Sequence, residues 1–170
     1  PAAGSAVTIS AQLSDISGNA VNTAGKTVTW SKSNANGSFA TATSTTNAAG
    51  IATISFTVHT VSATSTTVTA TSSTPTLTGT SSTITTVAGA ASKIAVQQVA
   101  SPIRIIFQTQ PSFRIQDAFS NNITTSTATI TAALTAGTGG TIQGTTTAVA
   151  AGTLGIATFT NLGVDGVISN

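Results

Sequence analysis

The sequence predicts an all-β chain of two tandem β-sandwich domains, and three observations carry this prediction. Short runs of residues alternate between apolar and hydroxyl side chains, which is the period of a strand with one buried face. Clusters of Gly and Asn separate these runs and favour turns. A two-part motif also occurs twice: DISGNAV at residues 15–21 returns as DAFSNNI at 117–123, and GIATI at 50–54 returns as GIATF at 155–159. Two dissimilar pieces in the same order indicate a repeated module.

Length and composition agree with two small domains. The chain of 170 residues could hold one large domain or two small ones, and the repeat decides for two, residues 1–90 and 91–170. Small residues at 89–92 precede a new strand and mark the boundary. Charged residues make up 5% of the chain, against about 25% in an average soluble domain, whereas Thr makes up about a fifth. Because β-branched Thr suits pleated surface, we expect a neutral, hydroxyl-coated exterior.

Alternation predicts the strands of the first domain in chain order. The first run places Val, Ile, Ala and Leu on one face and Thr, Ser and Gln on the other. The second places Val28 and Trp30 on one face, and the third ends with His59 on the solvent face. These runs are residues 7–14, 27–31 and 52–59, and the turns between them are predicted at 18–19, 34–37 and 47–50.

The second domain repeats this alternation. Its strands are predicted at residues 93–99, 113–116 and 127–134, with a Gly-rich turn at 137–140. No segment of either domain has a convincing helical period. Short strands separated this regularly by turn residues are typical of a sandwich.

The predicted strands before and after the motif differ between its two copies. A strand at 93–99 precedes the second copy, but nothing equivalent precedes the first. The first copy is followed by runs at 65–71 and 77–86, which the second domain lacks. We therefore expect the first domain to lack its opening strand and the second its closing strands. Two explanations stay open: the chain is a piece of a longer array, or neighbouring subunits complete each other's sandwiches by strand addition.

The residues that could carry chemistry are few. His59 is the only histidine, and the chain has three carboxylates and no cysteine. Asp15 and Asp117 hold equivalent positions in different domains, so we expect them to lie far apart. Trp30 lies on an apolar strand face and is predicted to be a core residue. We predict no catalytic residue, no cofactor site and no metal site, and hence no enzyme.

The repeated turn has a structural interpretation. A carboxylate at the start of a turn accepts backbone N–H bonds and fixes the loop. The turn residues predicted to do this are Asp15, Gly18, Asn19, Asp117 and Asn121. Calcium is the alternative, but it binds six to eight oxygens and usually several carboxylates, whereas each turn has one Asp.

Charge and apolar runs exclude other functions. The net charge of +2 comes from five dispersed cations, whereas phosphate recognition needs a dense basic patch, so no nucleic-acid partner is expected. No apolar run approaches the roughly 18 residues of a transmembrane segment. Two N-glycosylation sequons, at Asn36 and Asn122, fall in predicted turns and are candidate modification sites in a secreted protein.

At this point the residues resemble a known family. The series GSAVTI at 4–9, the turn at 15–21, Val28-Thr-Trp30 and GIATI at 50–54 is similar to the bacterial immunoglobulin-like repeats of invasin and intimin. QPSFRIQD at 110–117 is similar to repeats in long bacterial surface proteins. The resemblance covers most of the chain. It implies two immunoglobulin-like sandwiches in an extracellular array that acts as a stalk, spacer, adhesin or surface-layer element.

One segment departs from the family pattern. Residues 102–107 are more apolar than the small and polar residues that the repeats usually have there. We predict that this segment packs at a module or subunit interface. The residues concerned are Ile103, Ile105, Ile106 and Phe107.

The function expected is therefore structural. We predict an extracellular, non-catalytic protein of a surface layer, filament or adhesin stalk, whose partners are copies of itself or neighbouring repeats of a longer chain. Three alternatives stay open: a module that binds a host receptor or glycan, a phage fibre or decoration protein, and an accessory domain of a larger enzyme.

Overall fold

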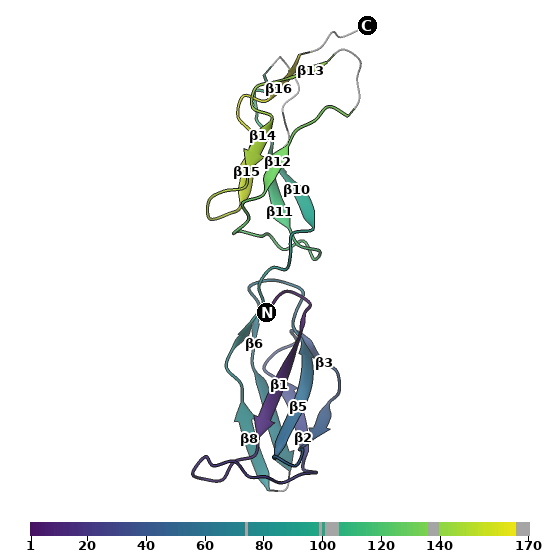
Figure 1. Ribbon diagram of the computed structural model, residues 1–170, viewed down its shortest axis with the longest axis vertical. Coiled ribbons are helices and arrows are strands. Elements are labelled where there is room, and N and C mark those ends of the chain that lie inside the picture. The colour runs from purple at the N-terminus through teal and green to yellow at the C-terminus, as the bar shows by residue number, and fades with distance from the viewer. Residues whose placement is uncertain (74, 99, 101–105, 136–139, 166–170) are drawn as a thin grey trace. The chain divides into compact units, whose positions relative to one another are not determined.

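The computed structural model describes all residues except 74, 99, 101–105, 136–139 and 166–170. The regular elements among the described residues are strands, with no helix, so the predicted all-β class is confirmed (Figure 1). The chain divides into two compact units, Pro1–Ala88 and Gly89–Asn170, against the predicted 1–90 and 91–170. Each unit is described below by itself.

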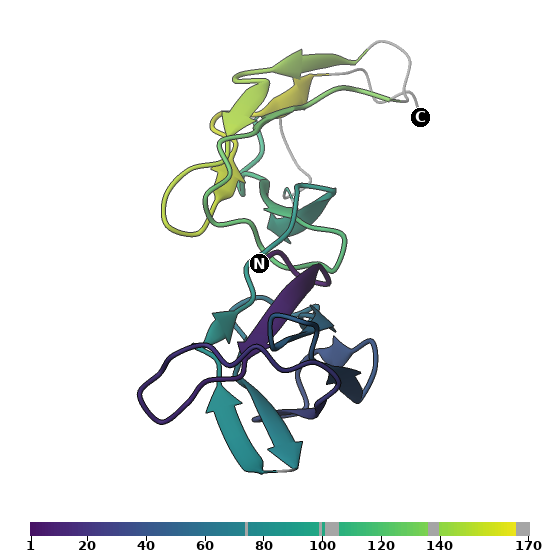
Figure 2. The ribbon, with the colours of Figure 1, turned by 60° about the horizontal axis from the view of Figure 1, so that its bottom comes forward.

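Unit 1 is a sandwich of two antiparallel sheets with a short third pair. Figure 2 shows the two layers: the purple first strand of the chain lies in one sheet, and the teal strands near residue 75 lie in the other. One sheet has the order β1 (Ala6–Gln12), β5 (Ile51–Thr57), β3 (Ser38–Phe39). The other has the order β4 (Thr43–Thr45), β2 (Thr27–Lys32), β7 (Val68–Ser73), β8 (Thr76–Thr80). The short pair is β6 (Ser65–Thr66) with β9 (Ile84–Thr85).

The core of unit 1 lies between its two sheets. Strand β5 shows the predicted alternation, with Ala52, Ile54 and Phe56 buried and the residues between them exposed. Trp30 of β2 is 5% exposed, and its indole N–H donates to Ser44 Oγ at 2.8 Å. The buried indole therefore keeps a hydrogen-bond partner, as a core tryptophan requires. Trp30 is a core residue, as predicted.

Unit 2 has three smaller antiparallel sheets. The first has the order β10 (Lys93–Gln98), β11 (Ser112–Gln116), β15 (Ile156–Thr158). The others pair β12 (Thr129–Thr131) with β14 (Thr147–Val149), and β13 (Thr141–Gln143) with β16 (Gly163–Asp165). Their buried side chains form one core, in which the rings of Phe113 and Phe159 meet edge to face at 6.0 Å.

Two predicted elements differ from the structure. The strand predicted at 127–134 is reduced to β12, and Leu134 is exposed, because β12 pairs only with the equally short β14. His59 lies two residues beyond the end of β5, outside any strand, and is half-buried rather than on the solvent face of a strand. The turn predicted at 137–140 lies outside the described residues except for Gly140.

Candidate functional site: a repeated carboxylate turn

The turn after β1 is organised by one carboxylate. Asp15 Oδ1 accepts the backbone N–H groups of Ser17 at 2.9 Å and Asn19 at 2.8 Å, and its Oδ2 accepts Asn19 Nδ2 at 3.0 Å. The backbone closes the same loop, because Asp15 N–H donates to Asn19 O at 2.9 Å. Gly18 has a φ of +84°, a backbone conformation that glycine adopts without steric cost. The side chain and the backbone therefore fix the turn together.

The turn after β11 repeats this geometry. Asp117 Oδ1 accepts the backbone N–H groups of Phe119 at 2.9 Å and Asn121 at 2.8 Å, and its Oδ2 accepts Asn121 Nδ2 at 2.8 Å. Asp117 N–H donates to Asn121 O at 3.0 Å. Ser120 stands where the first turn has glycine and has a φ of +69°. The two turns are the same structure at two places in the chain.

One contact distinguishes the second turn. Asp117 Oδ2 also accepts the backbone N–H of Gly89 at 2.8 Å, at the start of unit 2. Asp117 is accordingly 1% exposed, whereas Asp15 is exposed. The carboxylate of the second turn thus holds the segment that leads into its own unit.

Hydrogen bonding keeps both carboxylates ionised. Burial raises the pKa of Asp117, but the hydrogen bonds from the Asn121 side chain and from the backbone N–H groups of Gly89, Asn121 and Phe119 outweigh burial and lower that pKa to about 2. The pKa of Asp15 is lowered as well, first by the Asn19 side chain and then by the Asn19 backbone N–H. An ionised carboxylate is the stronger acceptor for these N–H groups.

The two parts of the repeated motif touch each other. A Cβ on Gly50 would lie 2.0 Å from Val21 O, and a Cβ on Gly155 would lie 2.4 Å from Ile123 O. Both distances are far below van der Waals contact, so only glycine allows this approach. The glycine of GIAT therefore backs onto the end of the Asp turn in each unit, which explains why the two pieces occur together.

This arrangement positions backbone and leaves the carboxylates little capacity for catalysis or metal binding. The Asp15 and Asp117 oxygens are taken up by N–H donors, and His59 Nδ1 accepts the backbone N–H of Val61 at 3.0 Å. Across the described residues, no three His, Asp or Glu side chains come close enough together to hold a metal ion. No helix in this part of the chain is long and apolar enough to span a membrane.

The remaining predicted residues have local roles. Asn36 is half-buried, and its backbone N–H donates to Asn34 Oδ1 at 2.9 Å. Asn122 is half-buried as well, and its Oδ1 accepts Gln116 Nε2 at 2.9 Å, so this side chain already has a partner. Glycosylation at Asn36 and Asn122 stays a prediction.

The predicted interface segment is described only in part. Ile103 and Ile105 lie outside the described residues. Ile106 is 40% exposed. Phe107 packs against the core of unit 2, and its N–H donates to Leu162 O at 2.9 Å. For Phe107 the side chain thus has neighbours within its own unit, and the interface stays a prediction.

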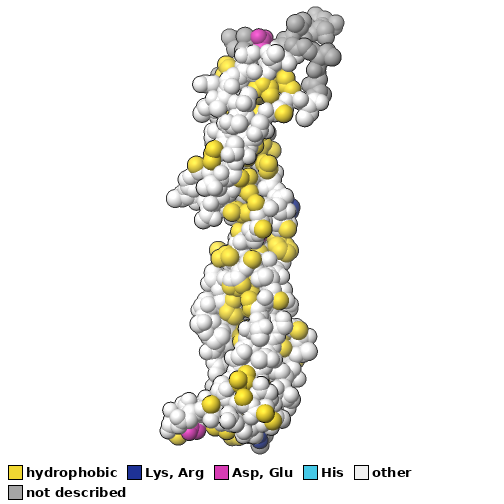
Figure 3. Space-filling model, in the orientation of Figure 1, with side chains coloured by type: hydrophobic (Ala, Val, Ile, Leu, Met, Phe, Trp, Pro, Cys, Tyr) yellow, Lys and Arg dark blue, Asp and Glu magenta, His cyan; other side chains and the backbone are white. Residues whose placement is uncertain are grey.

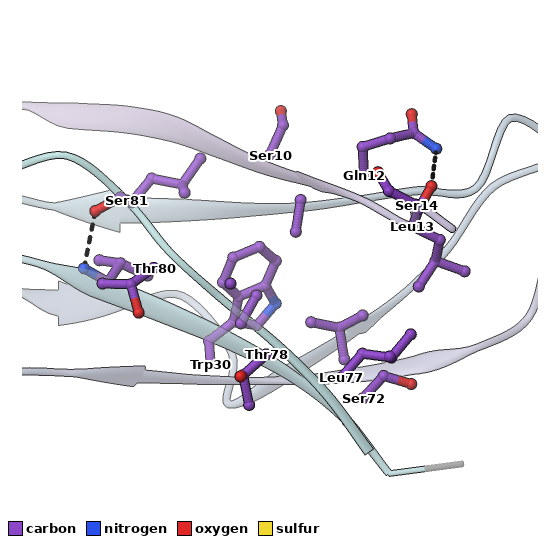
Figure 4. A pocket seen from close by; sticks show the side chains of 16 residues that line it. Ser10, Gln12, Leu13, Ser14, Trp30, Ser72, Leu77, Thr78, Thr80 and Ser81 are labelled. Carbon is purple, nitrogen blue, oxygen red and sulfur yellow. Dashed lines mark hydrogen bonds between the residues drawn. The ribbon is translucent and has the colours of Figure 1, made fainter. Parts of the chain in front are cut away.

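The sequence reasoning missed two features. No sequence pattern predicts the hydrogen bond between Gly89 and Asp117, although the predicted domain boundary lies at residues 89–92. The sequence reasoning also did not find a groove of about 420 Å³ in unit 1, lined by β1, β2, β7 and β8 (Figure 4). No local pattern in the sequence marks this groove, because its lining residues come from strands that only sheet pairing brings together.

Comparisons with known proteins give one distant likeness. No protein-family model matches the sequence, and no curated protein matches it. Among solved structures the chain is similar to the D0-D1 domain of intimin, with 16% sequence identity and a TM-score of 0.43. The match covers 94% of this chain and 78% of that chain. Intimin is also one of the proteins whose repeats the sequence motifs resemble.

Proposed function

We propose that this protein is a non-catalytic structural element of an extracellular surface assembly, such as a surface layer, a filament or an adhesin stalk. The observation that carries the proposal is the repeated turn. The carboxylates of this turn accept hydrogen bonds from backbone N–H groups. In unit 2 the Asp117 carboxylate also accepts the backbone N–H of Gly89, the first residue of that unit. A module whose polar side chains hydrogen-bond to its own first residue is suited to transmit mechanical load along a chain of modules.

The surface supports this role. Lys, Arg, Asp and Glu side chains are sparse on the face shown in Figure 3, where uncharged polar and apolar atoms predominate. Neutral Thr-rich faces can lie against one another without like-charge repulsion. Few Lys and Arg residues also leave few tryptic cleavage sites, which suits a protein exposed outside the cell.

Electron microscopy of the native material tests the proposal. Cells of the source organism are labelled with antibodies against the chain, and the released material is imaged and weighed. We expect surface labelling and ordered arrays, filaments or stalks that contain the chain. A soluble monomer without surface labelling contradicts the proposal.

A ligand-binding adhesin module is the second candidate, and one observation favours it. Ile16 is fully exposed beside Asp15, and Phe119 is 50% exposed in the equivalent turn of unit 2. Apolar side chains at loop tips are suited to contact a receptor. Binding to a glycan array or host receptor that Ile16→Ser and Phe119→Ser abolish supports this candidate, and unchanged binding by both variants contradicts it.

A further inference from the structure

The loop between β2 and β3 contains the one Asn-Gly pair of the sequence, Asn36-Gly37. When Asn precedes Gly, the backbone nitrogen of the glycine can attack the Asn side-chain amide, because glycine has no side chain that hinders the approach. No other Asn of the chain is followed by Gly. The loop therefore holds a reactive pair, and its surroundings decide whether the reaction proceeds.

The side-chain amide of Asn36 is not held in place. Its backbone N–H donates to Asn34 Oδ1 at 2.9 Å, but its half-buried side-chain amide makes no hydrogen bond to any residue that the structure describes. The amides of nearby Asn residues are held. Asn34 Nδ2 donates to Ser65 O at 2.7 Å, and Asn47 Oδ1 accepts the backbone N–H of Ile51 at 3.0 Å. Asn36 thus differs from these residues in having a side chain that can turn toward Gly37.

The attacking nitrogen is also without a partner. Gly37 precedes β3, whose first pair is Ser38 opposite Thr57, and among the described residues none accepts a hydrogen bond from the Gly37 N–H. Gly37 has a φ of +71°, and a Cβ at this position would collide with the ring of Phe56, so only glycine fits. The fold therefore requires a glycine after Asn36 and leaves its nitrogen open to react.

A positive charge is fixed beside this peptide group. Lys32 Nζ donates to Gly37 O at 2.6 Å and to Ala35 O at 2.9 Å, and these bonds hold the ammonium 3.5 Å from Asn36 O. Asn36 O belongs to the same peptide group as the Gly37 nitrogen. A fixed cation at this distance stabilises the negative charge that the peptide group acquires when the nitrogen loses its proton. Lys32 is half-buried, so solvent screens this effect less than at an exposed site.

We propose that Asn36 is a site of deamidation, promoted by the Lys32 ammonium. The Gly37 nitrogen gives up its proton to solvent and forms a bond to Asn36 Cγ. The bond from Cγ to Nδ2 breaks, and Nδ2 takes up a proton and leaves as ammonia. Water then adds to either carbonyl of the resulting cyclic imide and opens the ring to aspartate or isoaspartate. The reaction consumes water and releases ammonia, and nothing is oxidised or reduced.

The reaction changes the charge and the backbone of the loop. It replaces a neutral amide with a carboxylate, and this single negative charge lowers the formal net charge from +2 to +1. Isoaspartate also inserts a methylene group into the main chain just before β3, where Gly37 backs onto Phe56. An N-linked glycan at Asn36 would occupy Nδ2, so glycosylation and deamidation of this residue exclude each other. This inference goes beyond the proposed function, because it holds whether or not the protein is a surface element.

Mass spectrometry tests the site. The full chain is incubated at neutral pH and sampled over days, and each converted Asn adds about 1 Da. Trypsin releases residues 33–93 as one peptide, whose fragmentation distinguishes Asn36 from Asn34 and Asn47. We expect conversion at Asn36 ahead of Asn34 and Asn47, and none at this position in Asn36→Gln. If Asn36 stays intact while the guanidinium-unfolded chain converts, or if Asn34 or Asn47 converts first, the proposal is wrong.

Substitution of Lys32 tests the promotion. Lys32→Met removes the charge, whereas Lys32→Arg keeps it. In the folded chain we expect Lys32→Met to slow conversion of Asn36 at least about threefold and Lys32→Arg to keep most of the rate. In the guanidinium-unfolded chain all three proteins should convert at the same rate, because the ammonium is no longer fixed. Trp30 fluorescence checks that the variants are folded. A rate that Lys32→Met leaves unchanged or raises in the folded chain overturns the proposal.

Discussion

At the scale of single residues, Asp117 is a buried carboxylate that organises the second copy of the turn. Its carboxylate accepts hydrogen bonds from four N–H groups and is 1% exposed. Asp117→Asn replaces one acceptor oxygen with an amide N–H₂ group, which is itself a donor and cannot accept these hydrogen bonds. We expect this variant to lower the melting temperature of unit 2 and to expose the Gly89 amide to hydrogen exchange. The control is Asp15→Asn, which affects the three corresponding hydrogen bonds in an exposed turn and should cost less. Equal losses in the two variants contradict this prediction.

The same carboxylate predicts a dependence on pH. Its pKa falls from 3.8 to about 2 on folding, so the unfolded chain binds a proton at higher pH than the folded chain. The stabilisation is therefore present above about pH 4 and is lost as the pH falls toward about 2. Urea unfolding of unit 2, followed by amide hydrogen exchange, should show the free energy of unfolding decreasing in this interval. Asp117→Asn should flatten that decrease, and an unchanged slope contradicts the assignment.

Position 120 tests the backbone of the turn. Ser120 adopts a φ of +69°, where its counterpart Gly18 adopts +84°. A non-glycine residue in this region costs about 1 kcal/mol. Ser120→Gly should therefore stabilise unit 2 by up to about 1 kcal/mol, although it removes the exposed hydrogen bond from Lys93 Nζ. The reverse change, Gly18→Ser, should destabilise unit 1 by about the same amount, as measured by urea unfolding. Effects of the opposite sign contradict the equivalence of the turns.

At the scale of elements, β5 organises unit 1 because both other strands of its sheet pair with it. Phe56 is fully buried and packs against Phe39 with ring centroids 5.2 Å apart. Phe56→Ala should destabilise unit 1 by about 3–5 kcal/mol through lost burial and the cavity that remains. Thr53→Ala on the exposed face of the same strand is the control and should change stability by less than about 0.5 kcal/mol. Chemical unfolding followed by Trp30 fluorescence measures both, and similar costs contradict the assigned faces.

Strands of this kind could be predicted from the sequence, but their pairing could not. Alternation located β5 closely, because a strand with one buried face has period two. It placed a strand of eight residues where β12 has three, because alternation does not show how long a partner the strand finds. The Asp turn was predicted from a local interaction, a carboxylate that accepts backbone N–H groups of its own turn. The Gly89–Asp117 bond spans 28 residues, and no local pattern marks a backbone donor at that distance.

At the scale of the whole molecule, the two units have separate cores. The buried cluster around Trp30 draws only on residues of unit 1, and the cluster around Phe159 draws only on residues of unit 2. The sequence predicted this division through its repeat. It could not show the groove, because the lining residues come from separate strands that only sheet pairing brings together.

Separate cores predict two unfolding transitions. Trp30 is the only tryptophan, so its fluorescence reports unit 1 alone, whereas far-UV circular dichroism reports both units. Two-state unfolding of the whole chain would make the two probes coincide. We expect the two probes to differ. Phe56→Ala should shift the fluorescence transition, which reports unit 1. Asp117→Asn should leave the fluorescence transition in place and shift the part of the dichroism change that belongs to unit 2. Coincident transitions that both variants move together would show that the two units unfold as one cooperative body.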